Sequence, residues 1–274
     1  MKRCSLLILI LGLLVMQPAR AAVSPQLKCL WSSYRNFKIT ADKKNIYFSK
    51  SGVMPYGDGE PDKPRDVKHI TSIDQMFYRP YPFGFKKNGD GNAAFNTPIL
   101  ADQYVGVRYQ PLFKALYGYT PAQVENDLVS VQWVDGTWVL FNRRYGAAKA
   151  LQNVVSKLRA LIKERPELKK YLVRPQGTYE WRRIANSTNL SMHSFGVAID
   201  INLRYSDYWW WDMRDDHKLR YRNRIPIEIP TIFEQNGFTW GGKWYRYDTM
   251  HFEYRPELTM ARSACEKGFE NYRD

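Results

Sequence analysis

The stretch Leu190–Asn202 reads LSMHSFGVAIDIN, and it decides how the functional part of the chain folds. Val197–Ile199 is short, apolar and partly β-branched, which predicts a buried strand. Gly196 allows a tight turn just before that strand. The strand leads into Asp200, and a charged carboxylate at the end of a buried run is costly unless it is paired. A metal ion bound by Asp200 and His193 together would provide that pairing.

A second stretch, Trp240–Glu253, reads WGGKWYRYDTMHFE and places further polar side chains in an aromatic frame. Asp248 and His251 lie three residues apart within it. The two stretches together offer His193, Asp200 and His251, a three-ligand set with an open fourth position that is typical of catalytic zinc. Asp248 is left over as a carboxylate near the metal, suited to act as a general base.

The segments SMHSFGVAID, WGGKW and DTMHFE resemble the M15 zinc peptidases. These are D-alanyl-D-alanine carboxypeptidases and dipeptidases, and L-alanyl-D-glutamate endopeptidases, of bacterial and phage origin. The resemblance covers roughly residues 130 to 260 and is thinner upstream. It implies a bound Zn²⁺ with His193, Asp200 and His251 as ligands.

Further side chains around the metal are candidates for roles in the site. Tyr179–Arg182 reads YEWR and is similar to the family segment whose arginine reaches the active site. Arg182 is therefore expected to stabilise the oxyanion, with Arg183 as a competing candidate and a solvated basic pair as the ordinary alternative. Ser191 either hydrogen-bonds the substrate or only orders the loop. Glu253 either orients the ligand two residues before it or forms a surface salt bridge.

Residues 1–21 have the pattern of a secretory signal peptide. Lys2 and Arg3 precede an apolar run from Leu6 to Met16, and Ala19–Ala21 offers a small-x-small cleavage site. The run is too short for an ordinary membrane span, and no later stretch is long and apolar enough to be one. We therefore expect an exported protein, either periplasmic or secreted to the cell wall.

The charge of the chain is strongly basic. The formal net charge is +14, and cleavage of residues 1–21 removes three basic residues and no acid, which leaves +11. Nucleic acid is one partner for such a charge, but export argues against it, and an anionic wall polymer fits better. A generally basic exported protein is the ordinary alternative.

Two of the three cysteines remain after signal cleavage, Cys29 near the new N-terminus and Cys265 near the C-terminus. In an oxidising compartment an even pair predicts a disulfide. Two free buried thiols are the alternative.

The clearest helix runs from Ala147 to Arg165, where apolar residues fall on one stripe and Pro166 closes the pattern. An aromatic-rich irregular segment over 78–100 is expected to pack on the main domain. Other patterns predict a strand at 44–48 and helical structure over 110–130, with a helix start at Thr120–Pro121. A hairpin is expected over 129–141, turning at Asp135–Gly136. A short helix is expected over 230–236 and ends at Gly237.

These elements predict an α+β fold in which a small antiparallel sheet carries the zinc site and helices flank it. The resemblance implies an architecture like that of hedgehog domains and D-Ala-D-Ala metallopeptidases, with an N-terminal extension. We divide the chain into a signal peptide (1–21), an N-terminal region packed on the catalytic domain (22–128) and a zinc peptidase domain (129–274).

Two further features have less specific readings. Trp209–Trp211 is a run of three tryptophans that either lines a groove for glycan or peptide or packs in the core or at its rim. His69 and His217 lie in polar stretches without partners at metal-ligand spacing, so we expect them to be exposed.

The resemblance implies zinc-dependent hydrolysis of the stem peptides of peptidoglycan, and we favour D-alanyl-D-alanine carboxypeptidase activity. L-alanyl-D-glutamate endopeptidase activity is the alternative within the family. A zinc-stabilised wall-binding module without turnover is the alternative outside it, since the hedgehog domain has a similar site with a zinc that is usually taken as non-catalytic. Asp248 and Arg182 favour the enzyme because a binding module needs neither.

Overall fold

The computed structural model describes residues 22–59, 63, 70–85, 106–185, 187–211, 213 and 221–272. The predicted signal peptide, His69 and His217 lie outside these ranges. Among the helices of the described ranges, none has the length and apolar character that crossing a membrane requires.

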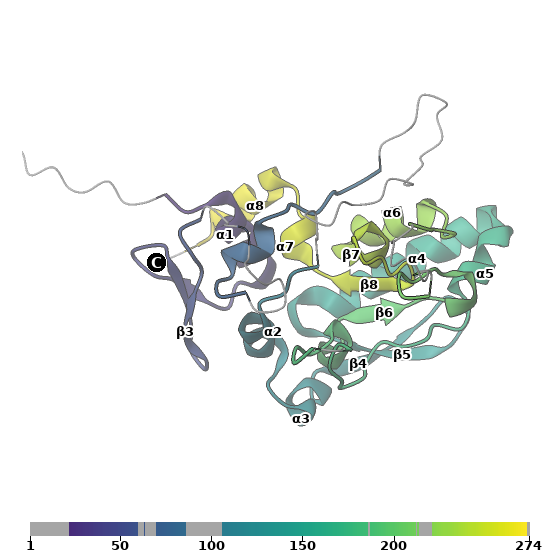
Figure 1. Ribbon diagram of the computed structural model, residues 1–274, viewed down its shortest axis with the longest axis horizontal. Helices are drawn as coiled ribbons and strands as arrows, with labels where there is room; N and C mark the ends of the chain where they lie inside the picture. Colours follow the sequence, from purple (N-terminus) through teal and green to yellow (C-terminus); the bar gives the residue numbers. More distant parts are fainter. Residues whose placement is uncertain are drawn as a thin grey trace, which may run out of the picture.

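The chain folds into helices and small antiparallel sheets, which confirms the α+β class. The helices are α1 (Pro25–Tyr34), α2 (Gln110–Tyr117), α3 (Pro121–Glu125), α4 (Ala147–Glu164), α5 (Lys169–Leu172), α6 (Glu228–Glu234), α7 (Pro256–Thr259) and α8 (Arg262–Phe269). The strands are β1 (Lys38–Ile39), β2 (Asn45–Phe48), β3 (Gly52–Pro55), β4 (Leu128–Gln132), β5 (Trp138–Asn142), β6 (Ala198–Asp200), β7 (Phe238–Trp240) and β8 (His251–Tyr254). Figure 1 shows α1, β3 and α8 at one end of the molecule and α4 with the β6–β8 strands at the other.

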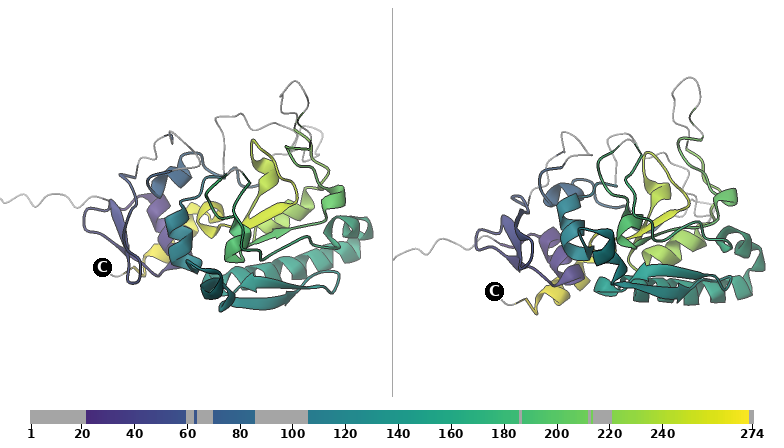
Figure 2. Two further views of the ribbon diagram at one scale, coloured as in Figure 1. Left: turned by 60° about the horizontal axis from the view of Figure 1, so that its bottom comes forward. Right: turned by 90° about the horizontal axis from the view of Figure 1, so that it is seen from below.

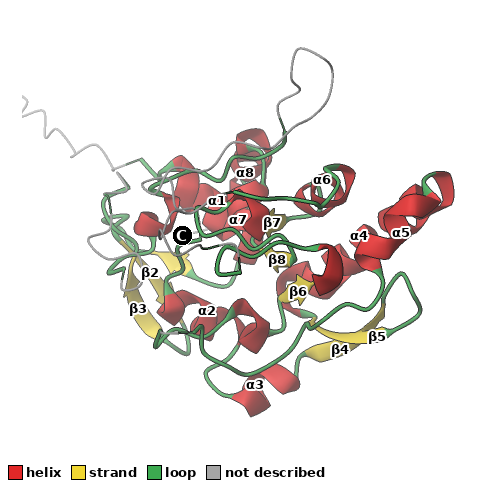
Figure 3. Ribbon diagram, turned by 45° about the vertical axis from the view of Figure 1, so that its right-hand side comes forward, coloured by secondary structure: helices red, strands yellow, loops and turns green. Residues whose placement is uncertain are grey.

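The sheet that matters for function has the order β6–β8–β7, with both pairings antiparallel. Asp200 of β6 lies opposite His251 of β8 in the register. The next residue of β8, Phe252, stacks on Phe233 of α6 with 3.9 Å between the ring centroids, and α6 lies beside this sheet (Figure 3). Buried aromatic packing therefore fixes the strand that carries one histidine.

Helix α4 and the β4–β5 hairpin lie side by side along one side of the site-bearing half (Figure 2). The helix predicted over 147–165 is confirmed, and Leu151, Val154, Val155 and Leu158 of its stripe are buried. The hairpin is also confirmed, and its connection contains Gly136 at φ 90°, a conformation that favours glycine.

The helical pattern over 110–130 divides into two helices and the start of a strand. Helix α2 stops at Gly118, whose φ of 139° is outside the helical range. Helix α3 begins at the predicted start, where the Thr120 side chain accepts a hydrogen bond from the Gln123 N–H and Pro121 is the first helical residue. The chain is already in β4 from Leu128.

The N-terminal and C-terminal helices pack on each other, since α1 contacts both α7 and α8. Cys29 of α1 and Cys265 of α8 form a disulfide with an S–S distance of 1.96 Å, which confirms the predicted pair. Buried side chains from 22–128 and from 129–274 belong to one hydrophobic core. The domain boundary at 128/129 stays a prediction.

Residues 81–85 pack against the WGGKW segment. Lys243 donates hydrogen bonds to the carbonyls of Pro82 and Gly84 at 2.6 and 2.8 Å, and its ammonium lies 2.5 Å from the Glu234 carboxylate. The Trp240 backbone N–H donates to the Tyr81 hydroxyl at 2.9 Å. The predicted packing of this aromatic segment on the main domain is therefore seen for 81–85, while 86–100 lie outside the described residues.

We expect the double substitution Cys29→Ser and Cys265→Ser to lower the free energy of unfolding by about 2–5 kcal/mol, because the bond constrains a very long loop of the unfolded chain. Denaturant unfolding of the oxidised wild type, the reduced wild type and the double variant measures the effect. The reduced wild type should match the variant, and an unchanged midpoint in both would contradict the prediction.

Candidate metal centre

Asp200 and His251 meet because their strands pair directly. Asp200 Oδ1 lies 3.0 Å from Nδ1 of His251 across the β6–β8 ladder. His251 is buried, and the Asp200 side chain is 19% exposed. The two strands thus fix a carboxylate and an imidazole next to each other, with limited access from solvent.

His193 reaches the same place from a 3₁₀ helix, η5 (Met192–Phe195). The Ser191 hydroxyl accepts a hydrogen bond from the His193 N–H at 3.4 Å and caps this helix. Gly196 ends it at φ 64°, and a Cβ atom there would lie only 2.5 Å from Leu128 Cδ2. The capping agrees with the loop-ordering reading of Ser191, and Gly196 makes the predicted tight turn.

The donor atoms of His193, Asp200 and His251 all lie within 4.8 Å of one another. Nε2 of His193 is 3.2 Å from Asp200 Oδ2 and 3.3 Å from Nδ1 of His251. Nδ1 of His193 is 3.1 Å from the Thr178 carbonyl. Because a carbonyl only accepts, Nδ1 carries the proton in the neutral ring, and Nε2 directs a lone pair at the carboxylate. Lone pairs that face each other in this way repel unless a proton or a metal ion lies between them, so these residues fit a metal ion.

The acid–base properties of the cluster agree with this. Burial alone would raise the pKa of Asp200, but the two histidines outweigh it and hold that pKa well below its usual range. Burial alone would lower the pKa of His251, but hydrogen bonding to Asp200 and the nearby Glu253 raise it to about 10. The protein therefore favours positive charge among these groups, and a metal ion would replace the proton.

Glu253 lies behind His251 and is only 1% exposed. Its Oε2 lies 3.5 Å from Nε2 of His251 and 2.8 Å from Nη2 of Arg108, and its Oε1 lies 3.2 Å from Nη1 of Arg255. Burial would raise the pKa of Glu253, but Arg108 and the other cations lower it below the usual range. Its burial excludes a surface salt bridge, and the carboxylate is in place to orient the His251 ring.

Asp248 lies close to the cluster but has a different environment. Its Oδ1 is buried, and no hydrogen-bond partner reaches it from the described part of the chain. Burial raises the pKa of Asp248 to about 7, Asp200 adds to the rise, and His251 and Arg182 partly offset it. The backbone of Gly241 lies close to the backbone of Asp248, and a Cβ atom at position 241 would lie only 2.5 Å from the Asp248 carbonyl oxygen. Asp248 is thus a carboxyl group poised to exchange a proton.

Arg182 lies on a segment that is attached to the His193 loop. Its backbone N–H donates to the Ser194 hydroxyl at 2.9 Å, and its Nε lies 3.0 Å from Oε2 of Glu180. Its charge acts on Asp248, as the pKa of that carboxyl shows. Both Arg182 and Arg183 are exposed. The roles of Arg182 and of Ser191 toward a substrate stay predictions.

Sequence reasoning missed Arg108 and Thr178 as supports of the ligands. Arg108 is 145 residues from Glu253 and lies in a stretch without a recognisable motif, so no local signal could reveal it. Thr178 contributes a backbone carbonyl, which any residue type could supply.

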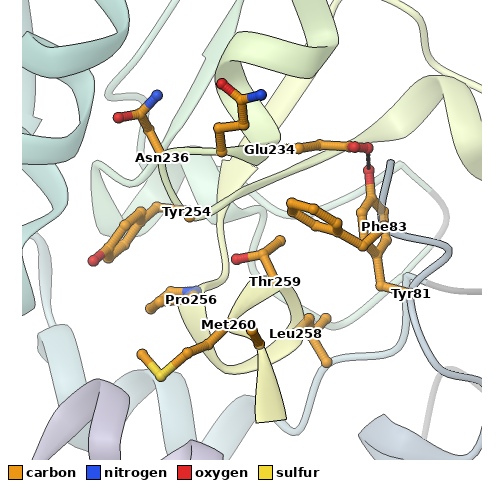
Figure 4. A pocket seen from close by; sticks show the side chains of 12 residues that line it. Tyr81, Phe83, Glu234, Asn236, Tyr254, Pro256, Leu258, Thr259 and Met260 are labelled. Carbon is orange, nitrogen blue, oxygen red and sulfur yellow. Dashed lines mark hydrogen bonds between the residues drawn. The ribbon is translucent and has the colours of Figure 1, made fainter. Parts of the chain in front are cut away.

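A separate cavity of 690 Å³ lies between residues 81–83 and the far end of the sheet (Figure 4). Its lining includes Tyr81, Phe83, Glu234, Gln235, Asn236, Gly237, Tyr254, Pro256, Leu258, Thr259, Met260 and Ala261. None of the metal-ligand candidates lines it, so the cavity is distinct from the cluster.

Comparison with known proteins gives one family assignment. Residues 185–254 match the model of the family described as D-alanyl-D-alanine carboxypeptidase. Comparisons with curated proteins and with solved structures give no match. The matched segment contains His193, Asp200, Asp248 and His251. The part of the chain that builds the candidate metal centre, residues 185–254, therefore matches a peptidase family of the M15 type.

Proposed function

We propose that the chain is a zinc-dependent peptidase that trims the stem peptides of peptidoglycan as a D-alanyl-D-alanine carboxypeptidase. The observation that carries the proposal is the convergence of His193, Asp200 and His251 close to Asp248, one carboxyl oxygen of which is buried, in a segment that matches a carboxypeptidase family. Two imidazoles and one carboxylate are a donor set that suits Zn²⁺ with an open coordination position.

The chain's own residues would divide the work as follows. His193, Asp200 and His251 hold the metal, which when bound polarises a carbonyl group and acidifies water. The Thr178 carbonyl and Glu253 fix the orientation of the two rings. The carboxylate of Asp248 accepts the proton of the attacking water and then gives it to the leaving amine. One buried oxygen of Asp248 has no described hydrogen-bond partner, which leaves it available for that proton.

Arg182 is proposed to donate hydrogen bonds to the carbonyl oxygen as negative charge develops there. Its guanidinium is exposed and influences Asp248 electrostatically, so it can approach a substrate held between them. Its present partner Glu180 is itself 70% exposed, and an exposed pair of this kind holds the arginine only weakly.

The disulfide and the basic net charge support a location outside the cytoplasm. A disulfide between Cys29 and Cys265 suits an oxidising environment outside the cytoplasm, and the basic charge suits an anionic wall polymer. We propose that the protein is exported to the periplasm or the cell wall.

Digestion of purified muropeptides followed by mass spectrometry tests the function. Loss of one terminal alanine is the expected result. Release of a longer stem fragment would identify an L-alanyl-D-glutamate endopeptidase instead. Zinc-loaded protein that binds wall peptides without cleaving any would identify a binding module.

We expect Arg182→Ala to lower turnover by roughly 10²–10³-fold, the usual loss when one donor to an oxyanion is removed. Arg183→Ala is the matched control, because it removes the same charge from the adjacent position. Steady-state kinetics on a pentapeptide substrate compare the two variants. Equal losses would indicate that only the general charge of the segment matters, and a larger loss for Arg183→Ala would reverse the assignment.

A further inference from the structure

Trp209, Trp210 and Trp211 form an aromatic platform on the surface. Trp210 and Trp211 are 59% and 57% exposed. Trp210 contacts Trp209 edge to face with 5.3 Å between the centroids, and Trp211 contacts Tyr208 in the same way at 5.5 Å. Each exposed indole thus contacts one neighbouring ring edge to face. More than half of each indole-bearing residue stays accessible to solvent.

The platform is attached directly to the candidate metal centre. Tyr208 pairs with Asp248 in an antiparallel β-bridge, and the Trp209 N–H donates to the Tyr247 carbonyl at 2.9 Å. A bridged pair of Cα atoms is ~5 Å apart, and each further residue adds at most ~3.6 Å. The three tryptophans therefore lie within roughly 16 Å of Asp248 along the chain.

Neighbouring large apolar side chains that are exposed together beside a candidate site indicate an interaction surface. Arg246 adds polarity to it, because its guanidinium lies 4.8 Å from the Trp209 ring centroid and the residue is exposed. Flat apolar ring faces next to a hydrogen-bond donor match a sugar ring, which has an apolar face of C–H groups and polar hydroxyl and amide groups at its edge.

We propose that this platform binds the amino-sugar rings of the glycan strand while the attached stem peptide enters the metal centre. The inference rests on the proposed function, and it names the substrate as peptide still linked to glycan rather than free peptide. A stem of four residues between the sugar and the scissile bond spans at most ~14 Å. That reach is of the same order as the upper limit of roughly 16 Å for the separation of the tryptophans from Asp248.

The test compares two substrates, a disaccharide pentapeptide and the same pentapeptide without sugar. The double variant Trp210→Ala and Trp211→Ala should lower the ratio of kcat/KM for the sugar-linked peptide to that for the free peptide by about tenfold, a common loss when buried aromatic contacts are truncated. Trp138→Ala, which removes an indole that is 66% exposed on β5, is the matched control and should leave the ratio unchanged. The double Trp→Phe variant keeps flat rings and should restore most of the ratio.

An unchanged ratio in the double alanine variant would overturn the proposal, whether both substrates lose activity equally or neither does. If the wild type cleaves neither substrate, the proposed function fails, and cosedimentation with glycan strands stripped of peptide still tests the platform. Binding that is lost in the double alanine variant supports the platform, and equal binding overturns it. Tryptophan-dependent binding to anionic lipid vesicles without binding to glycan would assign the surface to a membrane and would also overturn it.

Discussion

Asp248→Asn is expected to lower kcat by about 10²–10⁴-fold, the range for loss of a general base. The amide is similar in size to the carboxyl group, so the fold and the close contact at Gly241 should survive. Zinc content should stay at one ion per chain, because Asp248 is outside the group of three converging donors. Since substrate binding does not need the base, KM should change little and the loss should fall on the chemical step.

The matched control for this experiment is Asp207→Asn. Asp207 is also buried, with one carboxyl oxygen that has no hydrogen-bond partner among the described residues. It pairs with Arg224 at 3.0 Å instead of facing the cluster. The control should therefore lose far less turnover than Asp248→Asn. Comparable losses would show that the effect is not specific to Asp248, and unchanged turnover in Asp248→Asn would remove Asp248 from the mechanism.

His193→Ala and His251→Ala are expected to abolish both zinc binding and hydrolysis. Loss of a group that only orients a ligand already costs about 10–100-fold in metal affinity, and loss of a ligand itself should cost more. Metal analysis after dialysis measures zinc per chain, and unfolding measurements with and without added zinc show whether binding still stabilises the fold.

His69→Ala is the control for general effects of removing a histidine, because His69 lies outside both sequence motifs. It should keep full zinc content and activity. Full zinc occupancy in His193→Ala and in His251→Ala would show that the ligand assignment is wrong. Zinc loss with retained hydrolysis would separate the metal from the reaction.

The metal centre could be predicted from the sequence because its signals are local. The His193 loop, the strand before Asp200 and the DTMHFE segment each combine turn and strand patterns with a functional residue. The β6–β8 register then brings Asp200 and His251 together, as expected for two strands of one small sheet. Family resemblance and residue chemistry agreed on the same positions.

The supports of the centre could not be predicted because they are long-range. Glu253 was placed near His251 by its spacing, but only the fold shows that Arg108 and Arg255 surround it. The division of 110–130 into two helices depends on Gly118, a residue whose effect on helicity is modest unless the backbone leaves the helical range. For Trp210 and Trp211, exposure excludes packing in the core, and a sequence pattern does not contain that information.

Because α1 packs on α8, the packing of α1 can be completed only after α8 has been synthesised. Cys29 of α1 is synthesised 236 residues before its covalent partner, Cys265 of α8. Contacts between such distant parts of a chain form slowly, so the surface of α1 that packs on α7 and α8 is covered late. The covalent link at Cys29 can therefore close only after the whole metal-binding half, which lies between the two cysteines, has been synthesised.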